Sequence, residues 1–457
     1  MTSDAPSDGR ASGAPDPSVF VWTWLPGRTS PVVAGRVERV GDRLHFGYGR
    51  SYLERAGAVA LYLPELPLEP GLRPPPDGLT LAGALRDALP DAWGRRVILA
   101  RLAATSARSG SAPFALAADV DPDERAFMLE SGSNRFGALD FQGSAVDYVP
   151  RDGPDATLAE LHDAARRIEL GLALPAALDA AIVHGSSIGG ARPKALLFDG
   201  DRQLVAKFSS SDDVRPVVES EYVAMRLAAE AGLDVAPVRV TRVGGRSVLL
   251  VERFDRERTD GGWTRRATVS ALTLFALDEM MARYASYESL AELVRRRFDS
   301  PTATLHELFG RLTFNVLVGN TDDHARNHAA FWDGGALSLT PAYDVCPQAR
   351  TGGEATQAMR VSGTRSFSRI ELCLDAAPSF RLDRDGAIAI ARAQADTIRA
   401  RWESVCDECG LADAARRSLW GRQFLNPYAF VGLDRATLRR LGVEPDVAHG
   451  TEPPRSP

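Results

Sequence analysis

Three polar side chains between Gly319 and Asp344 have the types and spacing that phosphoryl transfer requires. Asp322 is followed five positions later by Asn327, and a second carboxylate, Asp344, comes after a short apolar passage. Enzymes that transfer phosphoryl groups set out, in this order, a carboxylate that accepts the proton of the acceptor hydroxyl and two oxygen ligands that hold magnesium. The order predicts Asp322 as the base and Asn327 and Asp344 as metal ligands. Asp323 is a second candidate for the base, although the spacing to Asn327 favours Asp322.

A lysine lies within an apolar strand candidate upstream of these groups. Residues 203–208 read Gln-Leu-Val-Ala-Lys-Phe, so Lys207 must reach solvent or an anionic partner, because an unpaired buried charge is costly. A solvent-facing lysine on an edge strand fits this pattern equally well. The helix expected over 217–231 carries Glu219 and Glu221, and either could pair with Lys207 or lie on the surface.

A segment rich in small residues runs from Ser186 to Lys194. Glycines such as Gly189 and Gly190 let backbone N–H groups approach phosphate oxygens closely, and Arg192 or Lys194 would add positive charge. The segment lacks the Gly-Lys-Ser/Thr ending of a Walker A loop. Taken alone, it is explained more simply as an ordinary turn than as a phosphate-binding loop.

Hydrophobic periodicity predicts the elements that must position these groups. Short β-branched and aromatic segments predict a small antiparallel sheet at 19–22, 32–37, 44–48 and 58–63. Further strands are expected at 135–141, 195–198, 203–208 and 249–254, the last placed to act as a nucleotide-binding hinge, and a hairpin at 331–332 and 337–339. Helices are expected at 81–102 with interruptions at Pro90 and Gly94, and at 156–170, 175–184, 217–231, 270–284, 288–298, 302–319, 386–403, 411–421 and 433–441. The hairpin would return Asp344 to the side of Asp322 and Asn327.

Composition limits the classes of protein that this chain can belong to. With 457 residues the chain exceeds what one core usually supports, and a net charge of −6 gives no global reason to expect nucleic-acid binding. Its four cysteines argue for a reducing compartment, and Cys406 and Cys409 form a C-x-x-C pair without the two further spaced ligands of a zinc site. No apolar run is long enough for a membrane span and no secretory signal is evident, so a cytoplasmic protein is expected.

In combination, several motifs resemble one family, the HipA-like serine/threonine kinases, which are the toxin halves of bacterial toxin–antitoxin pairs. The resemblance extends from Val19 to about Leu441. Its motifs are residues 46–48, 89–94, 187–194, 251–256, 319–327 and 341–344. The family differs from this chain at 269–274, where many members have a basic residue followed by Gln-Glu-Asp-Phe, and at Arg326, where lysine is usual. Arginine and lysine are not interchangeable at phosphate sites.

The resemblance implies a role for each matching residue. Asp322 would orient and deprotonate the acceptor hydroxyl, while Asn327 and Asp344 would hold Mg²⁺. Lys207 would bind the ATP phosphates with Glu221 as its helix partner. The remaining nucleotide-binding residues implied are Glu252 and Phe254, which would frame the adenine, and Ser187, Ile188, Gly189, Gly190, Ala191 and Lys194 in the loop. Ser187 falls where the family carries an autophosphorylated serine that silences the kinase, with Ser186 as the neighbouring alternative.

The resemblance also implies a fold and a domain organisation. An α+β fold is expected, with a protein-kinase-like bilobal architecture, an N-terminal β-rich subdomain and an all-helical C-terminal lobe. The expected units are a disordered segment at 1–17, the β-rich subdomain at 18–125, an N-lobe at 126–255, a C-lobe at 256–445 and a disordered tail at 446–457.

The expected function is an ATP- and Mg²⁺-dependent serine/threonine protein kinase of the toxin type. Its partners would be a separately encoded helix-turn-helix antitoxin of the HipB type, DNA only through that antitoxin, and a protein substrate such as an aminoacyl-tRNA synthetase or another translation factor. Two alternatives remain open on the sequence alone. One is a non-catalytic scaffold that binds the antitoxin as a co-repressor, and the other is a kinase that acts on a small molecule or lipid.

Overall fold

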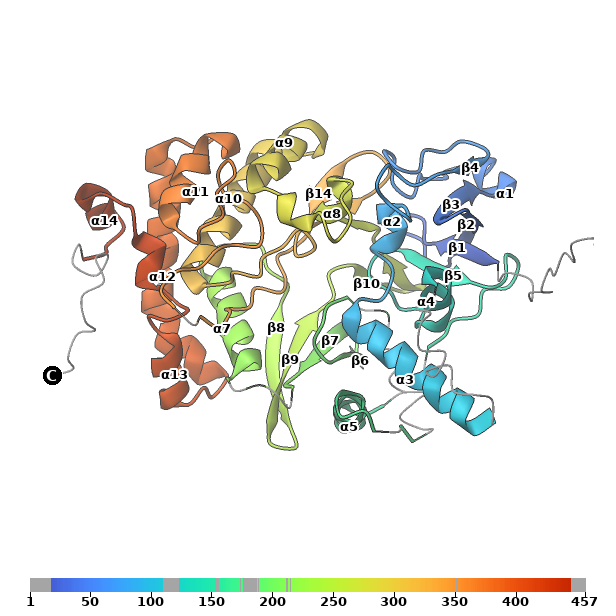
Figure 1. Ribbon diagram of the computed structural model, residues 1–457, viewed down its shortest axis with the longest axis horizontal. Coiled ribbons are helices and arrows are strands. Elements are labelled where there is room, and N and C mark those ends of the chain that lie inside the picture. Colours follow the sequence, from blue (N-terminus) through green and yellow to red (C-terminus); the bar gives the residue numbers. More distant parts are fainter. Residues whose placement is uncertain are drawn as a thin grey trace, which may run out of the picture.

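The protein is described by a computed structural model covering residues 18–109, 123–152, 156–172, 174–175, 187, 189–210, 213, 215–350 and 352–444. Three parts follow one another across the molecule in Figure 1: the amino-terminal sheet, a central four-stranded sheet and a largely helical part. Sheets and helices thus occupy different parts of one chain. The mixed α+β fold expected from the sequence is confirmed.

The amino-terminal sheet has five antiparallel strands in the order β4-β3-β2-β1-β5. Its strands are β1 (Val19–Thr23), β2 (Val32–Val40), β3 (Arg43–Tyr48), β4 (Leu72–Arg73) and β5 (Leu139–Gln142). The strand predicted at 58–63 is wrong: Ala60, Leu61 and Tyr62 are all buried in succession, and Tyr62 makes only an isolated bridge to Leu66. Apart from this bridge, residues 58–63 pair with no strand of the sheet, so this segment enters the core as a loop.

Four helices lie between the strands of this sheet in the chain, and a fifth follows its last strand. They are α1 (Arg50–Leu53), α2 (Gly83–Arg86), α3 (Ala92–Ser109), α4 (Glu124–Glu130) and α5 (Leu158–Glu169). The helix predicted over 81–102 is broken around Pro90, as expected, whereas Gly94 lies inside α3 without interrupting it. Most of the helix predicted at 175–184 lies outside the described residues.

The central sheet has the order β6-β7-β9-β8 and carries the lysine strand in its interior. Its strands are β6 (Lys194–Asp199), β7 (Arg202–Phe208), β8 (Val238–Val243) and β9 (Arg246–Glu252). Helix α7 (Val217–Glu230) packs between this sheet and the helical part. Its Tyr222 hydroxyl donates to Glu408 at 2.8 Å, which ties α7 to the long helix α12 (Arg384–Glu408).

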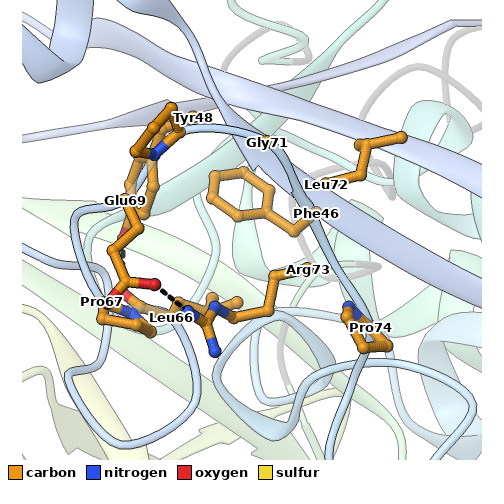
Figure 2. A pocket seen from close by; sticks show the side chains of 10 residues that line it. Phe46, Tyr48, Leu66, Pro67, Glu69, Gly71, Leu72, Arg73 and Pro74 are labelled. Carbon is orange, nitrogen blue, oxygen red and sulfur yellow. Dashed lines mark hydrogen bonds and ion pairs between the residues drawn. The ribbon is translucent and has the colours of Figure 1, made fainter.

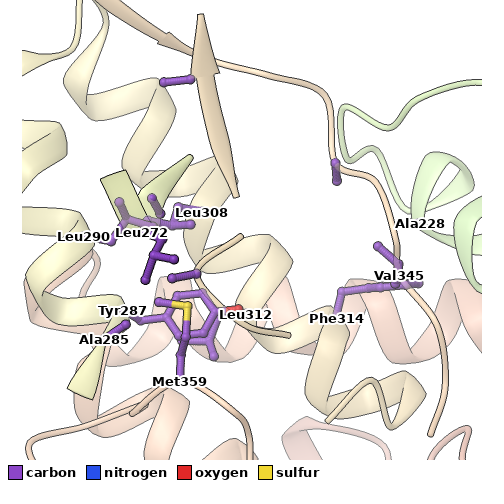
Figure 3. Close-up of a cluster of buried hydrophobic side chains, with 14 of the residues drawn as sticks. Ala228, Leu272, Ala285, Tyr287, Leu290, Leu308, Leu312, Phe314, Val345 and Met359 are labelled. Carbon is purple, nitrogen blue, oxygen red and sulfur yellow. The ribbon is translucent and has the colours of Figure 1, made fainter. Parts of the chain in front are cut away.

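The helical part is built around α10 (Pro301–Val318), most of whose side chains are buried. The other helices are α9 (Tyr287–Arg297), α11 (Ile370–Ala376), α13 (Asp413–Leu419), α14 (Arg435–Arg440) and the 3-10 turns η3 (Ala282–Tyr284), η4 (Ala377–Phe380) and η5 (Pro427–Phe430). Figure 3 shows Leu308, Leu312 and Phe314 of α10 among the buried side chains of this core. Proline at the first position of α10 and Gly319 in the left-handed conformation at its end fix both boundaries.

Small β-elements interrupt the helical part. They are the hairpin β10 (Arg256–Thr259) and β11 (Gly262–Arg265) and a three-stranded sheet of β12 (Thr268–Ser270), β13 (Ala329–Trp332) and β14 (Leu337–Leu339). The hairpin predicted at 331–339 is therefore confirmed. The lobe predicted as all-helical is mainly helical and also carries this sheet.

The helix predicted at 270–284 is wrong. Only α8 (Ala271–Leu274) forms there, because Ala276 adopts a left-handed backbone with φ of 52° and the chain turns before η3. The amphipathic pattern in this stretch arises from a turn that packs one side on the core. No helix in the part of the chain described combines the length and apolar character that crossing a bilayer requires.

Candidate functional site

The segment that follows α10 presents Asp322 and Asp323 to opposite surroundings. Asp322 is exposed, whereas Asp323 is buried beneath the segment. The hydroxyl of Tyr287 donates to Asp323, and Nε2 of His328 lies 3.0 Å from its Oδ1. A carboxylate engaged in this way cannot approach an acceptor hydroxyl. Of the two candidates for the base, only Asp322 is accessible.

Partial burial and the nearby charge of Asp344 both raise the pKa of Asp322. Asp344 lies 22 residues further along the chain than Asp322, yet within electrostatic range of it. The hairpin β13–β14 accounts for this return, and a parallel bridge between Val235 and Ala342 fixes the end of the returning segment. The N–H of Ala236 donates to the carbonyl of Ala342 at 2.9 Å.

The two predicted metal ligands offer oxygen donors of the kind that Mg²⁺ prefers. The side-chain N–H of Asn327 donates to the backbone carbonyl of Asp322 at 3.3 Å, which turns the amide oxygen away from that carbonyl. The side chain of Asp344 is 41% exposed, on a backbone with φ of 60°. Among the described residues there is no group of three or more His, Cys, Asp or Glu side chains that could hold a metal alone. The pair fits a Mg²⁺ ion that takes its other ligands from phosphate and water.

Lys207 joins the central sheet, α7 and the segment that carries Asp344, a predicted metal ligand. Its Nζ lies 2.6 Å from Oδ1 of Asp344 and also contacts the carboxylate of Glu221, which is buried. Burial opposes the charge of Lys207, but the two carboxylates raise its pKa overall. The same ammonium group holds the pKa of Asp344 down at about 2. Glu219, the other candidate partner, instead accepts a hydrogen bond from Ser247 at 2.6 Å.

The small-residue loop lies next to this ion-pair cluster. Gly190 has φ of 104°, and a side chain at this position would overlap Nζ of Lys194. Lys194 is only 4% exposed and donates to the carbonyl of Gly189. Burial, and to a lesser extent the charge of Lys207, lower the pKa of Lys194 to about 8. The two lysines lie close together because Lys194 of β6 pairs directly with Lys207 of β7 in the sheet.

The other loop residues differ in accessibility. Ser187 is 2% exposed, and its Oγ has no hydrogen-bond partner within the described residues. Gly189 and Ala191 are exposed, and Arg192 is paired with Asp213. Ile188 lies outside the described residues, as does Ser186. The loop thus has exposed residues at Gly189 and Ala191, while its serine is buried.

Comparison with known proteins connects this arrangement to a family. Residues 186–402, which include every group described above, match the HipA-like C-terminal domain. This segment is similar to that domain and is called the HipA-like domain below. The family resemblance read from the sequence motifs is confirmed.

Two curated relatives match parts of the chain. The putative kinase Y4mE of Sinorhizobium fredii is 32% identical over 174 residues, which are 35% of this chain and 41% of that protein. The serine/threonine-protein kinase toxin HipA of Shewanella oneidensis is 28% identical over 184 residues, 35% of this chain and 42% of that protein. The chain thus spans less than half the length of either relative.

A solved structure matches over a wider range. It is the complex of HipA, HipB and operator DNA from the toxin–antitoxin system of Shewanella oneidensis MR-1, with a TM-score of 0.61 at 19% identity. The match covers 94% of this chain and 100% of that chain. At this identity the likeness concerns the fold, and it includes the amino-terminal sheet as well as the HipA-like domain.

The predicted hinge residues lie at the edge of this domain's site. Glu252 ends β9, its N–H donates to the carbonyl of Pro237 at 2.9 Å, and its side chain lies 3.5 Å from Arg202. Phe254 packs instead into an aromatic cluster that sequence reasoning missed, made of Phe136, Phe331 and Tyr343. Tyr343 directly precedes Asp344, so Phe254 contacts the segment that carries Asp344. No spacing in the sequence indicates this cluster, because its members come from four separate segments.

Two further residues of the motif at 251–256, Arg253 and Asp255, form a buried hydrogen-bond network. Arg253 donates two hydrogen bonds to the buried Asp255 at 2.9 and 2.7 Å, and also binds the backbone carbonyls of residues 134 and 135. Asp255 accepts from the N–H of Gly137 at 2.7 Å. This network attaches the segment before β5 to the HipA-like domain.

The two places at which this chain departs from the family pattern, Arg326 and residues 269–274, also make specific contacts. Arg326 forms ion pairs with Glu279 at 2.8 Å and with Asp91. Asp91 belongs to the part of the chain from β1 to β5, residues 19–142, which is called the amino-terminal module below. In the altered segment 269–274, the N–H and hydroxyl of Ser270 donate to Asp87 at 2.6 and 2.8 Å. Both departures therefore make contacts with the segment around α2 and α3.

Two cavities lie away from these groups. The shallow pocket of Figure 2, about 120 Å³, is lined by residues 46–74 of the amino-terminal sheet and its proline-rich loop. A larger cavity of about 380 Å³ lies between that sheet and the β-elements of the helical part. Neither cavity is lined by a predicted site residue. The candidate site is defined by its polar contacts.

Proposed function

We propose that this chain is an ATP-dependent serine/threonine protein kinase of the toxin type, restrained by a separately encoded helix-turn-helix antitoxin. The observation that carries the proposal is the contact of Lys207 with both Glu221 and Asp344. Kinases require a strand lysine paired with a helix glutamate, and a metal-binding aspartate beside them. The names of the two curated relatives, a putative kinase and a kinase toxin, support the same activity.

In the proposed reaction Asp322 orients the acceptor hydroxyl and accepts its proton. The hydroxyl oxygen forms a bond to the γ-phosphorus while the bond from that phosphorus to the bridging oxygen of ADP breaks. Asn327 and Asp344 would hold Mg²⁺, whose charge offsets the charge on the phosphate oxygens. Because a serine or threonine hydroxyl is not ionised near neutral pH, the rate depends mainly on positioning and on charge stabilisation.

ATP would lie between Lys207 and the small-residue loop at 186–194, which is called the Gly-rich loop from here on. Exposed backbone groups at Gly189 and Ala191, and the ammonium groups of Lys194 and Lys207, would bind the phosphates, and Glu252 and Phe254 would frame the adenine. Ser187 is the proposed autophosphorylation site. Because this serine is buried, the modification requires the loop to leave its place, and a phosphate of nearly two negative charges would oppose its return.

The proposed partner is an antitoxin that binds DNA. The complex of HipA with HipB and operator DNA has the fold of this chain, and the net charge of −6 is unfavourable for direct DNA binding. DNA would therefore be reached only through the antitoxin. The proposed substrate is a protein of the translation apparatus.

The test is transfer of radiolabelled phosphate from ATP by the purified full-length chain. Replacing Asp322 with Asn should lower transfer by about 10²- to 10⁴-fold, because the base is lost, while ATP binding is retained. Asp201→Asn, in the exposed turn between β6 and β7, is the matched control and should retain transfer. Equal transfer by the wild type and Asp322→Asn would refute the role of Asp322, and a wild type without transfer would favour a scaffold.

A second experiment identifies the acceptor. Phosphoproteomics after controlled induction should show protein sites that appear with the wild type and are absent with Asp322→Asn. If the labelled product is a lipid or small molecule, the assignment as a protein kinase is wrong. Phosphate on Ser187 in the Asp322→Asn protein would show that another kinase modifies this serine.

A further inference from the structure

Asp91 connects three segments that are distant in the sequence. It precedes α3, and its carboxylate accepts a hydrogen bond from the backbone N–H of Gly190 in the Gly-rich loop. The second carboxylate oxygen is paired with the guanidinium of Arg326, which lies between Asp322 and Asn327. The side chain of Asp91 is 18% exposed, so both contacts are largely shielded from water.

The same motif holds the Gly-rich loop at two more points. The N–H of Trp93 donates to the carbonyl of Gly190 at 3.3 Å, and its indole donates to the carbonyl of Lys194 at 3.0 Å. Trp93 is fully buried. A side chain at Gly189 would come within 2.8 Å of the Asp91 carboxylate, so the loop approaches this residue as closely as glycine allows. Asp91 and Trp93 of the amino-terminal module therefore contact the loop at Gly190 and at Lys194.

The position of Asp91 before a helix does not by itself explain these contacts. An aspartate there usually accepts from the N–H groups of its own first helical turn. Here the backbone carbonyl of Asp91 accepts from Arg95 at 2.8 Å, while the carboxylate binds the two other segments. Hydrogen bonds to an ionised carboxylate are stronger than those between neutral groups.

Arg326 is held by charge on both sides. Burial opposes its charge, but Asp91 and Glu279 raise its pKa above the ordinary value of an arginine. Its partner Glu279 is 63% exposed, so the more shielded Asp91 contributes the firmer contact. The guanidinium is thereby fixed next to the segment that carries Asp322.

We propose that Asp91 is a positioning residue, which holds the Gly-rich loop and Arg326 in a fixed relation across the nucleotide site. The effect on phosphoryl transfer rests on the proposed function, whereas the effect on the loop does not. Loss of the Asp91 carboxylate frees the Gly190 N–H and leaves Arg326 with Glu279 only. The loop then moves more freely, ATP binds more weakly and Ser187 becomes accessible.

Hydrogen exchange measured by mass spectrometry on the full-length chain tests the effect on the loop without requiring activity. In Asp91→Asn, exchange of a peptide covering residues 189–194 should be faster by roughly tenfold or more, because a hydrogen bond to a charged group is weakened. Asp77→Asn, at an exposed position of the same module, is the matched control and should leave this peptide unchanged. Glu279→Gln removes the other partner of Arg326 and should also leave it unchanged. Unchanged exchange in folded Asp91→Asn overturns the proposal.

Kinetics test the second part. In Asp91→Asn the KM for ATP should rise more than kcat falls, since the loop binds the nucleotide, and Asp91→Glu should recover part of the loss. A lower KM in Asp91→Asn would mean that the carboxylate competes with phosphate, and would overturn the proposal. If the wild type transfers no phosphate, the proposed function fails while the exchange result stands. Should Asp91→Asn not fold, Asp91→Ser, which also lacks the carboxylate, enters the exchange assay, and unchanged exchange there overturns the proposal.

Discussion

At the scale of single residues, Lys194 is the group whose charge is most sensitive to conditions. It lies almost fully buried beside a second lysine, and its pKa is about 8 compared with an ordinary value of 10.5. At neutral pH it is mainly charged and can attract phosphate. At pH 9 most of it is neutral.

We therefore predict that the affinity for ADP falls as the pH rises through about 8. The phosphates of ADP are fully ionised from pH 7.5 upward, so the change in this range comes from the protein. Titration calorimetry between pH 7.5 and 9.5 should show a rising Kd in the wild type and a nearly constant Kd in Lys194→Met. A flat profile in the wild type would contradict the assignment.

The stability of the free protein should change in the opposite direction. Between about 8 and 10.5 the folded state binds fewer protons at Lys194 than the unfolded state does, so raising the pH in this window increases the contribution of this group to the free energy of unfolding. Below the folded pKa the penalty for burying the charge is fully present. Urea unfolding of wild type and Lys194→Met across this window separates the two effects.

At this scale the sequence predicts the residue types but not their surroundings. Asp322 and Asp323 are identical groups at neighbouring positions, and spacing to Asn327 is a correct but weak guide. The decisive difference is burial, which depends on Tyr287, 36 residues upstream. Likewise Glu219 and Glu221 both fit a helix face, and only the position of α7 against β7 selects Glu221 as the partner of Lys207.

At the scale of elements, the end of α10 sets the position of the segment that carries Asp322, the proposed base. Gly319 has φ of 70°, and a Cβ there would lie 2.8 Å from the carbonyl oxygen of Gln423. The next residues are held by the N–H of Asn320, which donates to the carbonyl of Asn315 at 2.9 Å. A shift of this turn would move Asp322.

We predict that Gly319→Ala lowers the free energy of unfolding by more than about 2 kcal/mol, since it adds a backbone clash to the cost of a left-handed alanine. Gly78→Ala is the matched control: Gly78 has φ of 82° but open space around it, and should cost only about 1–2 kcal/mol. Urea denaturation measures both. The proposed kinase activity should fall in Gly319→Ala only, and equal effects of the two changes on stability would contradict the role of Gln423.

Elements with strong periodicity were predictable and those set by tertiary contacts were not. The pattern at 217–231 correctly predicts α7, and the apolar segment at 203–208 correctly predicts β7. The pattern at 270–284 suggests a helix because apolar residues recur, yet Ala276 takes a left-handed backbone that no propensity indicates. The strand expected at 58–63 does not form. This segment is a buried loop, whose Ala60 carbonyl accepts a hydrogen bond from the indole of Trp332.

At the scale of the whole molecule, polar contacts join the amino-terminal module to the HipA-like domain. The indole of Trp332 donates to the carbonyl of Ala60 at 2.8 Å, and the N–H of Gly137 donates to the buried Asp255 at 2.7 Å. Such contacts lie within one continuous apolar core. The contact of Trp332 with Ala60 crosses the division at 125 expected from the sequence.

We predict one cooperative unfolding transition for both parts. Calorimetric and van't Hoff enthalpies should agree, and tryptophan fluorescence should coincide with far-UV circular dichroism, because tryptophans lie in both parts. Trp332→Phe should lower the free energy of unfolding by about 1 kcal/mol through loss of one buried hydrogen bond. Two separate thermal transitions in the wild type would show that the parts unfold independently.

The meeting of Asp91, Gly190 and Arg326 constrains how this protein can be recombined with its relatives. Gly190 and Arg326 lie 99 and 235 residues after Asp91 in the chain, yet both bind its carboxylate. A chimaera joined anywhere between α3 and the Gly-rich loop would take Asp91 from one parent and Gly190 and Arg326 from the other. We therefore expect the amino-terminal module to be exchangeable only between chains that keep all three partners.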